Sequence, residues 1–169
     1  MRTLYLLSVW LHILAAAVWI GGMIFVALVV VPVIRRPEMR QAAARLIHLT
    51  GIRFRWVGWA CLGLLLVTGL FNLTFRGIGW AELFSLPFWS ASLGRILALK
   101  LFVVAWILAL SATHDFAIGP RATTAWQENP GSAEASRLRR QATQLARVNM
   151  LLALIAVTFG VMLVRGTPW

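Results

Sequence analysis

The sequence has 169 residues, of which 60% are hydrophobic and 12% are charged, and its formal net charge is +11. A soluble domain carries about 25% charged residues, so this composition excludes a water-soluble core with a polar surface. The basic excess would suggest nucleic acid in a soluble protein. In a membrane protein it indicates arginine-rich loops on one side of the bilayer, and we expect no nucleic-acid partner.

Four apolar segments predict transmembrane helices, because about 20 mostly apolar residues cross the hydrocarbon core as a helix. They are residues 4–34, 56–75, 94–117 and 146–165. The first run continues through Val30 and Val31, which is too long for the apolar region of a signal peptide, so we interpret it as an uncleaved span. The whole chain, residues 1–169, is therefore expected to form one all-α four-helix bundle in the lipid bilayer.

The arginines predict how the bundle is oriented. The loops after the first and third spans together carry eleven arginines, whereas the opposite side carries four. The positive-inside rule then places both basic loops in the cytoplasm and both termini outside, in the cytoplasmic (inner) membrane.

The connecting segments are expected to be partly helical. Pro37 suits the start and Gly51 the end of an amphipathic helix near the lipid headgroups. Residues 132–147 are expected to extend the fourth span into the cytoplasm. The aromatic residues of segment 77–93 favour the membrane interface and predict a short interfacial or re-entrant helix over the outer end of the bundle.

Two ionisable side chains, His12 and Lys100, fall well inside the spans, where an ionisable group is costly and is by default a functional hypothesis. Counted from the outer ends of their spans at about 1.5 Å per residue, both lie roughly 10–12 Å deep. Thr68 and Thr158 reach a similar depth, so the sequence predicts one polar layer in the outer half of the bundle. Alternatively, a carbonyl or threonine hydroxyl satisfies His12 without any ligand, and Lys100 snorkels to the outer headgroups.

Other side chains are candidates for the same site or for a second one. Met162 lies slightly above the polar layer and is a candidate thioether ligand, while Trp19 is a candidate wall of the site. His48 and His114 form a second candidate metal-binding pair near the cytoplasmic boundary. His48 also falls on the polar face of the amphipathic helix, where solvation alone explains it.

Three short motifs, in this order and spacing, resemble the membrane domain of CopD-type copper resistance proteins. They are Leu11-His12 with Val18-Trp19-Ile20-Gly21-Gly22-Met23-Ile24-Phe25, then Leu66-Val67-Thr68-Gly69-Leu70-Phe71-Asn72-Leu73, and Gly94-Arg95-Ile96-Leu97-Ala98-Leu99-Lys100-Leu101. The resemblance covers roughly residues 8 to 121. It implies copper uptake or export across the cytoplasmic membrane, with a copper ion bound at His12.

His12 and Lys100 also resemble, more loosely, positions in the HemJ-type protoporphyrinogen oxidase family. That resemblance implies a haem b with His12 as axial ligand and with Lys100 near a propionate or substrate carboxylate. A third interpretation is a cofactor-free subunit of a homo-oligomer or larger membrane complex. We therefore hypothesise copper transport or resistance, with a haem b redox protein or oxidase and a structural subunit as the alternatives.

Overall fold

The computed structural model describes residues 2–166, with the side chain of Arg40 excepted. Within this range the chain is helical and has no strand. Four helical segments are long and apolar enough to cross a membrane, namely Arg2–Ile34, Gln41–Phe75, Ser92–Glu128 and Ala133–Arg165. The prediction of an all-α protein with four transmembrane helices is therefore confirmed.

Two of the four segments contain a π-helical turn shortly before a proline. The first consists of α1 (Arg2–Phe25), η1 (Val26–Val30) and α2 (Val31–Ile34), with Pro32 in the first turn of α2. The third consists of α6 (Ser92–Ala112), η3 (Thr113–Ile118) and α7 (Gly119–Glu128), with Pro120 in the first turn of α7. Proline lacks an N–H and clashes with the carbonyl four residues earlier, so the preceding turn widens.

The other two long segments are uninterrupted α-helices. The turn η2 (Pro37–Met39) leads into α3 (Arg40–Phe75), and α8 (Ala133–Arg165) forms the last span. The hydroxyl of Ser132 caps α8 by accepting a hydrogen bond from the Ala135 N–H at 3.0 Å. Gly166 ends α8 with φ of 88°, a conformation that glycine adopts without strain. As predicted, α8 extends well beyond the apolar span.

The prediction that a helix ends at Gly51 is wrong, because α3 runs without a break through that position. A single glycine inside a helix costs only about 1 kcal/mol. No proline follows Gly51 in this helix, so nothing stops it from continuing. The amphipathic segment and the second span are consequently one continuous helix.

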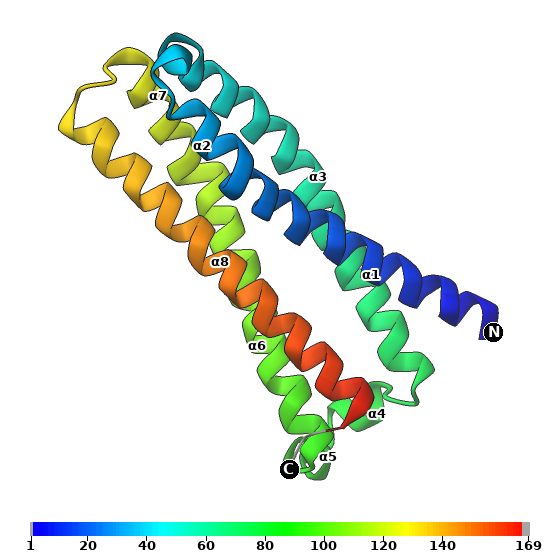
Figure 1. Cartoon of the computed structure of the whole chain (residues 1–169). Helices are drawn as coiled ribbons and strands as arrows, with labels where there is room; N and C mark the ends of the chain where they lie inside the picture. Colours follow the sequence, from blue (N-terminus) through cyan, green and yellow to red (C-terminus); the bar gives the residue numbers. More distant parts are fainter. Residues whose placement is uncertain (1, 167–169) are drawn as a thin grey trace.

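The long helices pack as two antiparallel pairs, α1 with α3 and α6 with α8 (Figure 1). The apolar core lies between the pairs and takes side chains from all four helices, namely Trp19, Leu62, Val103, Ile107 and Ala153. Many large apolar side chains, such as Leu28 and Val67, are exposed on the outside of the bundle. A surface of this kind is suited to lipid.

The two ends of the bundle differ in composition. At one end, which we call the terminal end, lie both ends of the described chain and the short helices α4 (Trp80–Leu83) and α5 (Leu86–Ser90) (Figure 1). The other end, the arginine-rich end, carries η2 and α7. The two short helices bear out the expectation of helix in segment 77–93. Which end faces the cytoplasm stays a prediction from the arginine distribution.

Candidate functional site

The His12 imidazole is fixed inside the α1/α3 pair by Thr68. Its Nδ1 lies 2.7 Å from the Thr68 hydroxyl oxygen, and that oxygen lies 2.6 Å from the carbonyl oxygen of Leu64. A hydroxyl has one proton to donate, and the carbonyl can only accept it. The Thr68 hydroxyl therefore accepts from Nδ1–H of His12. In the neutral imidazole this leaves Nε2 unprotonated, which is the form that binds metals.

Small residues allow this close approach of the two helices. A Cβ built on Gly69 would stand 3.5 Å from Cε1 of His12, so the imidazole lies against the backbone of α3. Ser8, one turn before His12, donates a hydrogen bond of 3.5 Å to the carbonyl oxygen of Thr68. Ser8 and Thr68 are both buried. The polar groups around His12 thus come from two helices and are shielded from lipid.

Lys100 brings a positive charge to the same region from α6. Its Nζ would stand 3.5 Å from a Cβ built on Gly160 of α8, so the ammonium occupies the space that this glycine leaves free. Lys100 is thus a second ionisable side chain in the part of the bundle that contains His12. Within residues 2–166 no hydrogen bond joins the ammonium to another protein group. When protonated, the Lys100 amine is therefore a positive charge that no carboxylate among residues 2–166 neutralises.

The other members of the predicted layer lie apart from His12. Thr158 is exposed, and its hydroxyl donates back to the carbonyl oxygen of Leu154 in its own helix at 3.1 Å. Met162 is half-buried. Trp19 is a member of the apolar core, where its indole packs 3.5 Å from the Cβ position of Gly58. The structure thus joins His12 to Thr68, with Lys100 nearby.

A second polar cluster surrounds Asp115 in η3. One carboxylate oxygen accepts a hydrogen bond of 3.0 Å from Nε1–H of Trp59 on α3. The other lies 2.9 Å from Nδ1 of His114. The predicted partner, His48, is exposed, and the described residues contain no group of three or more His, Cys, Asp or Glu side chains placed to hold a metal. Asp115 is not among the site residues predicted from the sequence. Its position shortly before Gly119-Pro120, where the helix widens, is the sequence feature that could have identified it.

Aromatic and polar groups extend this cluster. The ring centroids of Trp59 and Phe116 are 5.6 Å apart, and the guanidinium carbon of Arg55 lies 5.5 Å from the Phe116 ring centroid. One turn further into the bundle, Nδ2 of Asn149 donates to the hydroxyl of Ser111 at 3.0 Å. Oδ1 of Asn149 is buried and has no protein partner. This acceptor is available to a bound water or ion.

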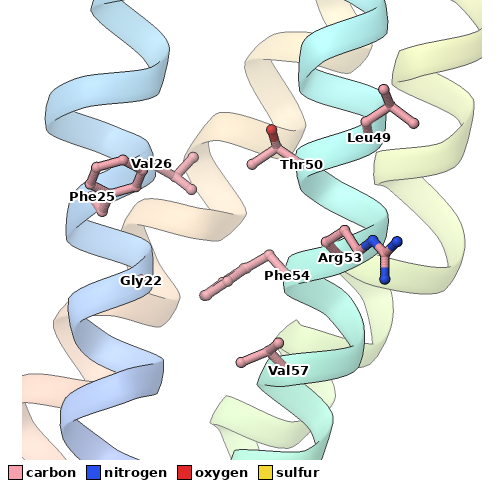
Figure 2. Close-up of a pocket in the computed structure, with 8 residues that line it drawn as sticks. All are labelled: Gly22, Phe25, Val26, Leu49, Thr50, Arg53, Phe54 and Val57. Carbon is pink, nitrogen blue, oxygen red and sulfur yellow. The ribbon is translucent and has the colours of Figure 1, made fainter.

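A separate pocket of about 450 Å³ opens between the α1–η1 segment and α3 (Figure 2). Figure 2 shows Phe54 pointing from α3 toward Gly22 on α1. Apart from Thr50 and Arg53 the lining is apolar or glycine, and it includes none of the predicted site residues. The full lining is Gly22, Phe25, Val26, Leu49, Thr50, Arg53, Phe54 and Val57.

The fold and these clusters define a multi-pass helical membrane protein with ionisable groups on both sides of an apolar core. A family model for copper resistance protein D matches residues 48–163. The chain belongs to this CopD family, as the sequence motifs predicted, and is a copper-related membrane protein. The match contains Thr68, Lys100 and His114, whereas His12 lies before it.

A relative and the solved structures complete the comparison. An uncharacterized protein of Aquifex aeolicus (strain VF5) is 32% identical over 162 residues, which cover 95% of each chain. The similarity to this relative therefore includes α1. No solved structure matches the chain significantly.

Proposed function

We propose that this chain binds copper ions within the membrane and moves them across it, with Nε2 of His12 as an ion ligand. The observation that carries this proposal is the hydrogen bond that commits Nδ1 of His12 to Thr68. Histidines that bind metals almost always donate their other ring N–H to an acceptor, usually a carboxylate, a backbone carbonyl or water, which orients the ring. Imidazole is a suitable ligand for copper.

The surroundings of His12 favour brief binding over storage. Transport requires a site that an ion can enter and also leave. One imidazole with a lysine nearby meets this requirement, because a protonated Lys100 would repel a cation that binds at Nε2. Coulomb repulsion is proportional to the product of the charges, so Cu(I) meets half the repulsion that Cu(II) meets. We therefore propose Cu(I) as the transported ion.

Copper binding by the detergent-purified chain tests the proposal. Bound copper is measured after incubation with Cu(I) under reducing conditions, and the His12→Gln variant is compared with wild type. Glutamine can still donate to Thr68 but is a poor copper ligand, so this variant should bind less copper. His48→Gln is the matched control, because His48 is exposed at the arginine-rich segment of α3, and it should bind as much as wild type.

An absorbance spectrum of the same sample distinguishes the two alternatives. A Soret band that sharpens on reduction would replace copper transport with the haem b interpretation, in which His12 is the axial ligand. No copper and no haem in the wild-type protein would leave the cofactor-free subunit. Proteoliposomes that accumulate Cu(I) with wild type but not with His12→Gln would establish movement across the bilayer.

A further inference from the structure

The pocket between the α1–η1 segment and α3 combines an apolar lining with one charged and one hydroxyl side chain. The residues of α3 that line it share one face of the helix, because they recur at intervals of three and four positions. They are Leu49, Thr50, Arg53, Phe54 and Val57. The opposite wall consists of Gly22, Phe25 and Val26. Arg53 is therefore the only charged side chain in the lining, and Thr50 has the only hydroxyl.

The pocket opens on the outer surface of the bundle. Phe25, Leu49 and Val57 are 57%, 52% and 45% exposed, whereas Phe54 packs against the apolar core. Figure 2 shows Phe54 and Val57 pointing from α3 toward the α1–η1 segment. The volume of about 450 Å³ is within the usual range of ligand pockets, about 300–1,000 Å³. In a bundle that crosses a membrane, an apolar opening of this kind faces lipid and not water.

The position of Arg53 along α3 places its charge near the lipid headgroups. Arg53 precedes the apolar run of residues 56–75 by three residues, or about 4.5 Å of helix. Val57, one turn further along α3, lies inside that run. On the opposite wall, Val26 begins the π-helical turn η1, and such turns occur frequently at functional sites. The pocket thus extends from the headgroup level into the hydrocarbon region.

The guanidinium of Arg53 is available to an external anion. The side chain is exposed, and the only salt bridge among residues 2–166 joins His114 to Asp115. Figure 2 shows the guanidinium extending from α3 away from the α1 wall, so the charge lies at the edge of the pocket. Thr50, three residues earlier, is adjacent on the helix surface and is half-buried. A guanidinium forms strong, charge-assisted hydrogen bonds with phosphate, and the neighbouring hydroxyl is a second donor for the same group.

We propose that this pocket binds one anionic phospholipid, with the phosphate at Arg53 and an acyl chain along the apolar lining. Phe54 and Val57 form the floor for the chain, and Thr50 is a second donor to the phosphate. Basic pockets between transmembrane helices bind anionic lipid headgroups in this way. A zwitterionic phospholipid has the same phosphate but brings an ammonium group, for which the lining has no carboxylate. The bound lipid contacts both walls and stabilises the α1/α3 pair, and this role is independent of the proposed copper function.

Native mass spectrometry of the full chain in an uncharged detergent tests this proposal. The protein is mixed with equal amounts of phosphatidylglycerol, which is anionic, and phosphatidylcholine, which is zwitterionic, with identical acyl chains. Wild type should retain one phosphatidylglycerol with a roughly fivefold preference, as expected for one arginine. Arg53→Gln should lose this preference. Arg45→Gln is the matched control, because it removes an exposed arginine of α3 from outside the pocket, and equal losses in both variants would contradict a site at Arg53.

A variant that fills the pocket tests the acyl-chain part of the proposal without removing the charge. Val57→Trp places a large ring in the space that the chain would occupy, so bound phosphatidylglycerol should be lost although Arg53 remains. Val67→Trp is the control, because Val67 is 68% exposed on the same helix outside the pocket. Retention of the lipid by Val57→Trp would contradict binding of the chain in this pocket. The variant also keeps the proposal testable if Arg53→Gln does not fold.

Thermal unfolding distinguishes the phospholipid from other occupants. A ligand that binds only the folded state stabilises it, so phosphatidylglycerol should raise the melting temperature of wild type and Val67→Trp. It should not raise that of Arg53→Gln or Val57→Trp. Inorganic phosphate at the same concentration should have no effect, and an equal rise with phosphate would overturn the phospholipid assignment. An equal rise with phosphatidylcholine would overturn the role of net charge.

Oligomeric state is the last outcome, since a second copy of the chain could also cover an apolar groove. The same mass spectra report it directly. Wild type and Val57→Trp should have the same oligomeric state. A wild-type dimer that Val57→Trp dissociates would assign the pocket to a second copy and overturn the proposal.

Discussion

The hydroxyl of Thr68 accepts Nδ1–H of His12 at 2.7 Å while it gives its own proton to the carbonyl oxygen of Leu64 at 2.6 Å. A backbone carbonyl on α3 thereby determines which nitrogen of an imidazole on α1 carries the proton. This relationship links the helix pairing to the chemistry of His12, because only the nitrogen that faces away from Thr68 keeps a lone pair.

Replacing Thr68 by valine should weaken copper binding at His12 without displacing α3. Valine has nearly the same shape as threonine but offers no acceptor, so Nδ1–H would lose its partner. We expect about tenfold weaker Cu(I) binding at this site, the lower end of the range for supporting groups. Chelator competition measures the change, and Thr68→Ser, which keeps the hydroxyl, is the control. Unchanged affinity in Thr68→Val would mean that Thr68 does not position His12.

Removing the charge of Lys100 should strengthen ion binding at His12. Lys100→Met keeps the length of the side chain and eliminates the repulsion, and we expect roughly tenfold tighter Cu(I) binding, about 1.4 kcal/mol. Lys100→Arg retains the charge and should bind Cu(I) as wild type does. If Lys100→Met also binds as wild type does, the ammonium reaches the headgroups and does not act on the site. We expect Lys100→Met to transport less copper, because the ion leaves more slowly.

The contact between Gly22 and Phe54 should be sensitive to a side chain on α1. A Cβ at Gly22 would overlap the Phe54 ring, whereas a Cβ at Gly21 would meet nothing within 4 Å. Gly22→Leu should therefore destabilise the fold by about 1–3 kcal/mol, as overpacked cores do. Gly21→Leu is the matched control. Thermal unfolding in detergent compares the two, and equal melting temperatures would show that the α1/α3 contact is looser than described.

Labelling of single cysteines tests the predicted orientation. The native thiol, Cys61, lies in α3 and can be removed as Cys61→Ser. In that background, Ser90→Cys at the terminal end should react with a membrane-impermeant maleimide in intact cells. Ser136→Cys at the arginine-rich end should react only after permeabilisation. The reverse pattern would place the arginine-rich loops outside, against the positive-inside rule.

The sequence predicts the spans well because their formation is local. A long apolar run has no stable alternative to a helix in lipid, where every backbone group needs an internal partner. The depth of His12 and Thr68 was predicted by counting helical rise, and the two side chains do meet. The helical rise per residue gives the depth of a side chain but not the direction in which it points from the helix axis. The sequence therefore predicts Thr158 beside His12 and Thr68, whereas in the structure Thr158 is exposed.

Asp115 could not be assigned a partner from the sequence. The donor that holds its carboxylate, Trp59, is 56 residues away on another helix. Contacts of this kind depend on how the two helix pairs are placed side by side, which no local pattern encodes. A histidine followed by an aspartate near a span end is therefore ambiguous until the tertiary structure is known.

The apolar core also limits how the molecule can work in a membrane. At the level of Trp19, Leu62 and Ile107, side chains from three helices fill the interior, and Ala153 of the fourth completes it. An ion or proton at that level would lose its hydration without replacement, at a cost of tens of kcal/mol for an isolated charge. The core of the described conformation is therefore an apolar barrier between His12 on one side and Asp115 on the other.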